Sequence, residues 1–306
     1  MEKNIELIHL EYLEKRFLAL DTSKLKKLKY LTRGYQGEAE FLLWFKKFGS
    51  EHAKIIPNYW FHDGKTMESD FLIMTEKVWY TVDVKNFDGT FEYKNNECWL
   101  NGYLFDENFF HTMSTRVRKL QRIAQDVSRN IEVVGAMVFI NEHCELKIDS
   151  QVDFDIVTRN QLKNYLTTVK QYRPLSTDYN KQIDTVLDRY RTTNPFRPTG
   201  LKPVELDKLR RGICCYNCSS YSIQITKKNI KCKQCNFDVL KREGVIEAAR
   251  QLRYIFIDNP EFVTTDSVWR FCDNLISKNT IRRALTSQYE RKSSGKSTYY
   301  DIPISN

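Results

Sequence analysis

Two pairs of cysteines place the strongest constraint on the fold of this chain. Cys215 and Cys218 form one CxxC pair, and Cys232 and Cys235 form a second pair after thirteen intervening residues. Each CxxC turn directs two thiolates at one point, and two such turns supply the tetrahedral sulfur shell that Zn²⁺ prefers. The intervening residues 219–231 have the pattern of a β-hairpin, so we expect a zinc ribbon over residues 206–240. A closed four-cysteine shell predicts a structural zinc rather than a catalytic one.

The cysteine pairs leave some alternatives open. They are also compatible with redox-active CxxC pairs or with degenerate knuckles that bind no metal. Cys214 is a second candidate for the first ligand, which we rank below Cys215 because Cys215 completes the CxxC pair.

Charge is distributed unevenly along the 306 residues. The net charge is +9, of which residues 201–306 contribute +8 and residues 1–200 contribute +1. This asymmetry indicates an anionic partner, with nucleic acid as the first candidate, although a basic surface without a partner is an alternative. No apolar run approaches the roughly 20 residues of a membrane span, and the N-terminus does not resemble a signal peptide. We therefore expect a cytoplasmic protein with no membrane partner.

The apolar patterns predict an α/β fold with five parts. A helical segment over residues 1–33 ends at a break in Gly34–Gly37 and precedes a second helix over Glu38–Phe48. Strands mixed with helices indicate a mixed α/β domain over 34–160. The remaining parts are a helical connector over 161–205, the ribbon over 206–240, and a helical unit with a terminal hairpin over 241–306.

The candidate catalytic residues lie on two neighbouring strands, Phe71–Met74 and Val78–Val84. If Glu76 and Lys77 form a two-residue loop between these strands, then Asp70 lies opposite Asp83 and Glu68 lies opposite Lys85. The pairing places two carboxylates about 5 Å apart at Cβ. Asp83 and Lys85 then share one face, because side chains alternate along a strand.

This arrangement suits hydrolysis of a phosphodiester. Adjacent carboxylates select Mg²⁺ or Mn²⁺, so Asp70 and Asp83 are the expected ligands of a catalytic metal. Lys85 would orient or deprotonate the attacking water, and Glu38 would support the metal or its water shell. The alternative is an ordinary ion-pair cluster on a solvated strand face. Against it, the carboxylates interrupt strongly apolar strands, where unpaired charges are costly.

The same residues resemble a known family. Residues 34–38 (Gly-Tyr-Gln-Gly-Glu), Asp70, residues 83–86 (Asp-Val-Lys-Asn) and Gly89 resemble the nuclease-related domain (NERD) proteins, which are similar to the PD-(D/E)xK nucleases. The resemblance implies a restriction-endonuclease-like mixed sheet flanked by helices. It also implies that Glu38, Asp70, Asp83 and Lys85 occupy the active-site positions. Two departures stand out: Thr112 where the family often has Gln, and Glu68 where Gln is common.

Basic residues elsewhere are candidates for nucleic-acid contacts. The helix predicted over Ser114–Val127 carries Arg116, Arg118, Lys119 and Arg122, for which we favour a solvated basic face over contact with a phosphate backbone. Residues 265–302 read as two helices and a hairpin, the pattern of a winged helix. The expected DNA contacts are Lys278, Asn279, Arg282 and Arg283 on the second helix, and Arg291, Lys292 and Lys296 on the hairpin.

Taken together, the sequence predicts a Mg²⁺- or Mn²⁺-dependent DNA nuclease that its zinc ribbon and basic C-terminal unit deliver to DNA. Two alternatives remain. One is a nuclease-like module that recognises DNA ends or junctions without cutting them. The other is an adapter whose ribbon binds a protein partner, and homo-oligomerisation is also open.

Overall fold

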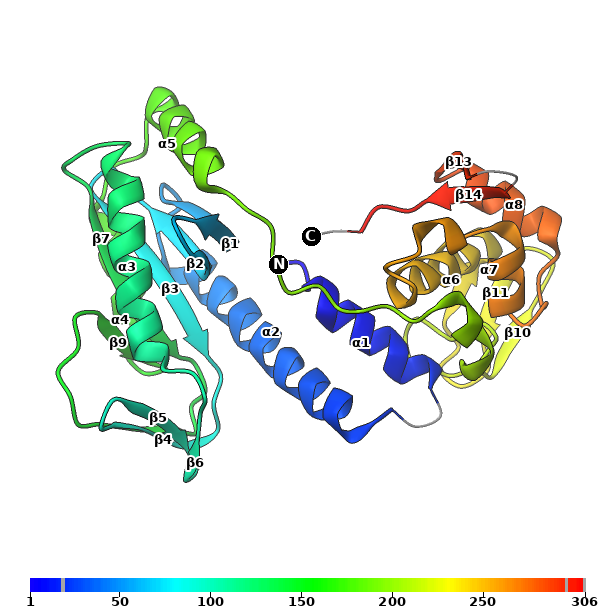
Figure 1. Ribbon diagram of the computed structural model, residues 1–306, viewed down its shortest axis with the longest axis horizontal. Coiled ribbons are helices and arrows are strands. Elements are labelled where there is room, and N and C mark those ends of the chain that lie inside the picture. The colour runs from blue at the N-terminus through cyan, green and yellow to red at the C-terminus, as the bar shows by residue number, and fades with distance from the viewer. Residues whose placement is uncertain (18–19, 295–296, 305–306) are drawn as a thin grey trace. The chain divides into compact units, whose positions relative to one another are not determined.

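The chain forms two compact units, shown as a computed structural model in Figure 1. The structure describes residues 1–17, 20–294 and 297–304. The first unit comprises Met1 and Tyr30–Pro195, and the second comprises Glu2–Lys29 and Phe196–Asn306. The change of unit after Pro195 falls within the Pro-rich segment at 194–200. The N-terminal helix, in contrast, belongs to the C-terminal unit.

A five-stranded mixed sheet forms the centre of the first unit. Its spatial order is β1 (Lys54–His62), β2 (Thr66–Met74), β3 (Val78–Lys85), β7 (Glu132–Phe139) and β9 (Asp155–Thr158). β1, β2 and β3 are antiparallel neighbours, whereas β3 pairs with β7 and β7 with β9 in parallel. A second sheet has the order β6 (Tyr103–Leu104), β5 (Glu97–Leu100), β4 (Gly89–Lys94) and β8 (Cys144–Ile148). The predicted α/β class with a mixed sheet is confirmed.

Successive side chains along a strand point to opposite faces of the five-stranded sheet, and on β2 both sets are apolar. Helices therefore cover both faces of the sheet. On β2, Phe71 and Ile73 pack in one core cluster with Phe41 and Phe45 of α2 (Thr22–Phe48), together with α4 (Leu162–Thr168). Leu72 and Met74 pack in the other cluster, against α3 (Phe109–Gln125) and α5 (Thr177–Tyr190). A short 3₁₀ turn, η1 (Val169–Gln171), follows α4. Figure 1 shows α3 lying along the sheet.

The predicted helix break at Gly34–Gly37 is wrong, because α2 continues through these residues for 27 residues in all. Neither glycine has a positive φ. A glycine within a helix costs only about 1 kcal/mol relative to alanine, and the packing of α2 on the sheet outweighs that cost. The break in the chain lies earlier, since α1 (Ile5–Arg16) ends before α2 begins.

The second unit contains a small sheet, several helices and a hairpin. The sheet consists of β10 (Ile223–Ile225), β11 (Asn229–Cys232) and β12 (Asp238–Leu240). The helical elements are α1, η2 (Pro203–Lys208), α6 (Lys241–Ile255), η3 (Pro260–Phe262), α7 (Thr265–Phe271) and α8 (Lys278–Thr286). The hairpin pairs β13 (Glu290–Ser294) with β14 (Ser297–Asp301). Within the described ranges, no helix has the length and apolar character needed to cross a membrane.

Buried polar contacts join α1 to α6 in this unit. The His9 ring nitrogen Nδ1 lies 2.8 Å from the Tyr254 carbonyl oxygen. Arg16 is 1% exposed and donates from both Nε and Nη2 to Gln251 Oε1. Its guanidinium also lies 4.0 Å from the centre of the Phe271 ring. These contacts span more than 200 residues of sequence, so apolar periodicity in α1 could not reveal them.

Candidate active site and metal centre

The hairpin of β2 and β3 has the predicted register. Phe71 lies opposite Val82 and Met74 opposite Trp79, as a two-residue loop requires. The ladder ends at Phe71, and Asp70 accepts a 2.7 Å hydrogen bond from the Val84 amide through Oδ2. The predicted Asp70–Asp83 and Glu68–Lys85 pairs therefore lie beyond the ladder, because a side chain occupies the place of the next ladder bond.

A buried ion-pair cluster lies at this end of the hairpin. Lys85 Nζ is 2.8 Å from Asp83 Oδ2, which confirms that these two side chains share a face. Arg116 Nη1 on α3 is 3.5 Å from the other carboxylate oxygen, Asp83 Oδ1. All three side chains are at most 15% exposed. The Lys85 ammonium also lies 4.3 Å from the centre of the Phe109 ring, so an aromatic face covers part of the cation.

Arg116 is the residue of this site that sequence reasoning missed. The expectation of a solvated basic face on α3 is wrong for Arg116, which is buried, whereas Arg118 is exposed. Helical spacing explains the difference, since Arg116 follows the buried Met113 by three positions on the inner face of α3. Thr112 lies one turn before Arg116, and its Oγ1 donates a 3.2 Å hydrogen bond to Glu107.

Two further basic residues of α3 are paired with an acid outside the cluster. Lys119 Nζ lies 3.6 Å from Asp63 Oδ2, and Arg122 Nη2 lies 2.7 Å from the same oxygen. Because Asp63 precedes β2, these ion pairs tie the middle of α3 to the β1–β2 connection. They hold the helix that presents Arg116.

A close contact of α2 positions Glu38 beside the cluster. A Cβ at Gly37 would lie 2.8 Å from the Asn86 Cβ and 3.3 Å from Ile140 Cγ2. Only glycine therefore allows the helix to approach β3 this closely. The next residue, Glu38, is in electrostatic contact with Asp70, Glu68 and Asp83. The site thus combines residues from α2, β2, β3 and α3.

The carboxyl groups of the site repel one another in a poorly solvated environment. Burial, with repulsion from Asp70, raises the pKa of Glu38 to about 9. Burial, again with repulsion from Asp70, raises the pKa of Glu68 to about 8, and burial with repulsion from Asp83 raises that of Asp70 to about 6. At neutral pH, Glu38 and Glu68 are therefore mostly protonated, whereas Asp70 is mostly ionised.

The pKa values of Asp83 and Lys85 are instead shifted so that the charged form of each side chain is favoured. Burial by itself would raise the pKa of Asp83, but the nearby Lys85 and Arg116 cations outweigh it and lower that pKa. Burial would lower the pKa of Lys85, yet the carboxylates of Asp83 and Asp70 raise it above its ordinary value. The site therefore contains an anion and an ammonium ion at neutral pH, beside carboxyl groups that are held partly protonated.

This donor set fits a small divalent cation. Mg²⁺ commonly uses one or two carboxylates and completes its shell with water and phosphate oxygens. Asp70 and Asp83 can provide those two carboxylates, and a cation between them would remove the repulsion that raises the pKa of Asp70. Among the described residues, the candidate group of three or more metal ligands is the four cysteines of the second unit, and it contains none of these carboxylates.

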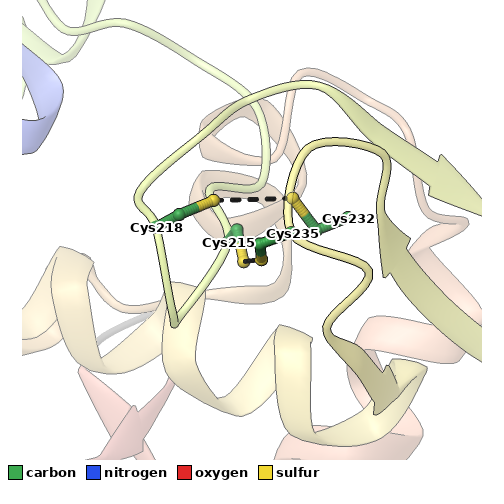
Figure 2. Close-up of side chains that lie close together, drawn as sticks. All are labelled: Cys215, Cys218, Cys232 and Cys235. Atoms are coloured by element: carbon green, nitrogen blue, oxygen red, sulfur yellow. Dashed lines mark hydrogen bonds between the residues drawn. The ribbon is translucent and has the colours of Figure 1, made fainter.

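The four predicted zinc ligands lie together in the second unit (Figure 2). Their sulfur atoms all lie within 4.8 Å of one another. The Sγ atoms of Cys215 and Cys235 are 3.6 Å apart, as are those of Cys218 and Cys232. A tetrahedron with Zn–S bonds of about 2.3 Å has edges of about 3.8 Å. The cluster is therefore close to the size that Zn²⁺ requires.

Both knuckles have the same backbone geometry. In the first, the Asn217 amide lies 3.4 Å from Cys215 Sγ, and in the second the Gln234 amide lies 3.4 Å from Cys232 Sγ. Such N–H donors stabilise thiolates. The amide of Phe237 lowers the pKa of Cys235 to about 6, whereas burial raises that of Cys215. The sulfur atoms are thus placed as metal ligands.

Cys214 is oriented away from this cluster. Its Sγ lies 3.7 Å from Gln251 Oε1 and 3.5 Å from the Gln251 Nε2 donor. The geometry therefore assigns the first ligand position to Cys215, as the CxxC spacing predicts.

The C-terminal elements follow the predicted order, with small shifts in their bounds. Ser277 caps α8 through a 3.3 Å bond from the Thr280 amide to its Oγ, so the helix begins one residue before Asn279. The predicted DNA contacts on α8 are all exposed: Lys278, Asn279, Arg282 and Arg283. Some of them have partners within the unit, since Lys278 pairs with Asp266 and Arg282 Nη2 lies 3.0 Å from Asn279 Oδ1.

The predicted wing residues lie on the terminal hairpin. Arg291 and Lys292 on β13 are exposed, and Lys292 pairs with Asp301 on β14. Lys296 lies outside the described residues.

One segment of the first unit matches a family model, and this segment contains Glu38, Asp70, Asp83, Lys85 and Arg116. Residues 33–140 match the nuclease-related domain (NERD). The NERD match confirms the resemblance seen in the sequence. The structure adds a buried arginine from α3 to the four NERD positions already expected.

Among solved structures, the chain is similar to the small subunit of the heterodimeric restriction endonuclease R.BspD6I. The sequences are 16% identical, the match covers 60% of this chain and 86% of that chain, and the TM-score is 0.23. No curated protein matches the chain.

Proposed function

We propose that this protein is a Mg²⁺- or Mn²⁺-dependent nuclease that hydrolyses phosphodiester bonds in DNA. The observation that carries the proposal is the buried Asp83 carboxylate. It lies between Lys85 and Arg116, and burial together with repulsion from Asp83 raises the pKa of the neighbouring Asp70. Buried carboxyl groups held together against their mutual repulsion are typical of functional sites. The NERD match over the same residues supports this assignment.

Each residue has a role that follows from its surroundings. Asp70 and Asp83 would hold the metal ion, and Glu38 would hold its water shell. When bound, the ion supplies Lewis-acid polarisation of the phosphoryl oxygen and acidifies a water molecule. Lys85 has a raised pKa and is protonated, so we assign it to orienting the water and stabilising negative charge rather than to removing a proton.

We propose that the second unit delivers the nuclease to DNA. Its ribbon would bind a structural Zn²⁺ through Cys215, Cys218, Cys232 and Cys235. Exposed arginines on α8 and β13 would contact phosphates in the manner of a winged helix, with a salt-sensitive and largely non-specific affinity. The net charge of +8 over residues 201–306 supports this role.

The test is cleavage of supercoiled, linear and single-stranded DNA with Mg²⁺, with Mn²⁺ and with EDTA. Asp83→Asn and Lys85→Met should each lower the rate by on the order of 10²–10³-fold, because they remove a metal ligand and a transition-state cation. Asp88→Asn is the matched control, since Asp88 is exposed and follows β3 closely. Thermal unfolding of every variant would establish that each remains folded.

Three results would separate the candidate functions. Metal-dependent cleavage that both active-site variants lose supports the nuclease. Cleavage that survives in both variants contradicts the assigned site. DNA binding without cleavage under either metal would favour the alternative of a non-catalytic module, and the absence of DNA binding would favour a protein-interaction adapter.

A further inference from the structure

The guanidinium of Arg116 is buried with part of its hydrogen-bonding capacity unused. Its side chain is 8% exposed, and its Nη1 lies 3.5 Å from Asp83 Oδ1, longer than a normal charge-assisted bond. The same nitrogen lies 3.9 Å from the Met113 sulfur, which is a weak acceptor. Within the described part of the chain, the buried Nε has no hydrogen-bond partner. A buried donor without an acceptor is costly and is rare in folded proteins.

The neighbouring carboxylates leave this donor unsatisfied. Asp83 already accepts from Lys85 at 2.8 Å through its other oxygen. Glu68 is close enough for Arg116 to offset part of the rise in the Glu68 pKa, but the hydrogen bond of the Glu68 carboxyl group is to Trp60. The Nε edge of a guanidinium is suited to side-on binding of a carboxylate or phosphate. The site therefore contains a cationic donor beside the carboxylates, and its Nε lacks an acceptor among the described residues.

We infer that Arg116 binds a non-bridging oxygen of the nucleic-acid phosphate held at the Asp83 site. The identity of the anion rests on the proposed nuclease function. Arg116 donates from Nε to the phosphate while Nη1 keeps its contact with Asp83. It thus places the phosphate next to Lys85 and the metal-binding carboxylates. Arg116 lies on α3, a helix tied by ion pairs to Asp63.

A direct test uses the Nε–H resonance of Arg116 in ¹⁵N-arginine-labelled full-length protein. The resonance is assigned by its loss in Arg116→Lys. Thymidylyl-(3′→5′)-thymidine is added with Ca²⁺, which takes similar oxygen ligands to Mg²⁺. The Arg116 resonance should shift and saturate, whereas the neutral methylphosphonate analogue should leave it unchanged. An unchanged resonance with the phosphodiester, or an equal shift with the neutral analogue, overturns the inference.

Kinetics provide a second readout, with Arg118→Met as the matched control on the exposed face of α3. Arg116→Met should lower kcat/KM by on the order of 10²-fold, and Arg116→Lys should restore part of it. Methylphosphonate substitution at the scissile phosphate should lower kcat/KM by a larger factor in the wild type than in Arg116→Met. Equal factors in the two proteins would contradict contact with that phosphate.

The two proposals fail in different ways. If the resonance shifts but wild-type protein never cleaves DNA, the anion site stands and the nuclease function fails. If wild-type protein cleaves DNA and the Arg116 resonance does not respond, the nuclease stands and the role of Arg116 is wrong.

Discussion

Removal of one thiolate from the ribbon tests the zinc site most sharply, because the chain contains a matched neighbour. Cys215 lies 3.6 Å from Cys235 within the four-sulfur cluster. Cys214 precedes it and contacts Gln251 instead. Cys215→Ser should therefore disrupt the zinc site, whereas Cys214→Ser should leave it intact. Both substitutions make the same chemical change at adjacent positions.

The size of the effect follows from the geometry. The two sulfur separations of 3.6 Å join one knuckle to the other, so each knuckle contributes two ligands to one cluster. Structural Zn²⁺ in small domains has an apparent binding free energy of about 10–16 kcal/mol, so one ligand in four contributes about 2.5–4 kcal/mol. At about 1.4 kcal/mol for each tenfold change, Cys215→Ser should weaken zinc binding by on the order of 10²–10³-fold.

The assay is competition for zinc against a chromogenic chelator, with zinc content measured by atomic emission. Wild type and Cys214→Ser should each retain one zinc per chain with similar affinity, and Cys215→Ser should release it at a far lower chelator concentration. Thermal unfolding should show that only Cys215→Ser loses stability when the chelator is added. Equal zinc loss in both variants, or none in either, would refute the assignment of ligands.

Three further predictions concern the active site and the basic surface. In metal-free protein, the free energy of unfolding should fall between pH 5 and 9. In this range the folded state keeps protons on carboxyl groups whose pKa is raised, whereas the unfolded chain has released them. Each such proton lowers the free energy of unfolding by up to about 1.4 kcal/mol per pH unit. Glu38→Gln should flatten this slope in urea unfolding series, and an unchanged slope would contradict the raised pKa. Gly37→Ala should reduce stability by about 1–3 kcal/mol and slow cleavage, since its Cβ would meet Asn86 at 2.8 Å; calorimetry that finds no loss would refute the close contact. Arg282→Ala and Arg283→Ala should each lower the slope of log affinity for DNA against log salt by roughly one if each contacts a phosphate, and an unaltered slope in fluorescence anisotropy would exclude that contact.

Features that depend on short stretches of sequence could be predicted well. The register of β2 and β3 follows from a two-residue loop, so Phe71 and Val82 were correctly placed opposite each other. The zinc ligands follow from CxxC spacing, because each knuckle closes on itself before the two meet. The Asp83–Lys85 ion pair follows from the two-residue period of a strand. In each case the contacts lie within a short segment of the chain, and the backbone geometry of that segment decides them.

Other features depended on contacts between distant parts of the chain. α2 continues through Gly34 and Gly37 because its apolar face packs on the sheet, an energy larger than the intrinsic cost of two glycines. Arg116 looked like one of several solvated basic residues, and only the placement of α3 beside β3 brings it to Asp83. The sequence by itself determined which chemical groups this protein has and how neighbouring ones are spaced. Only the tertiary structure decided which of them are buried together, because burial is a property of the packed elements and not of any one of them.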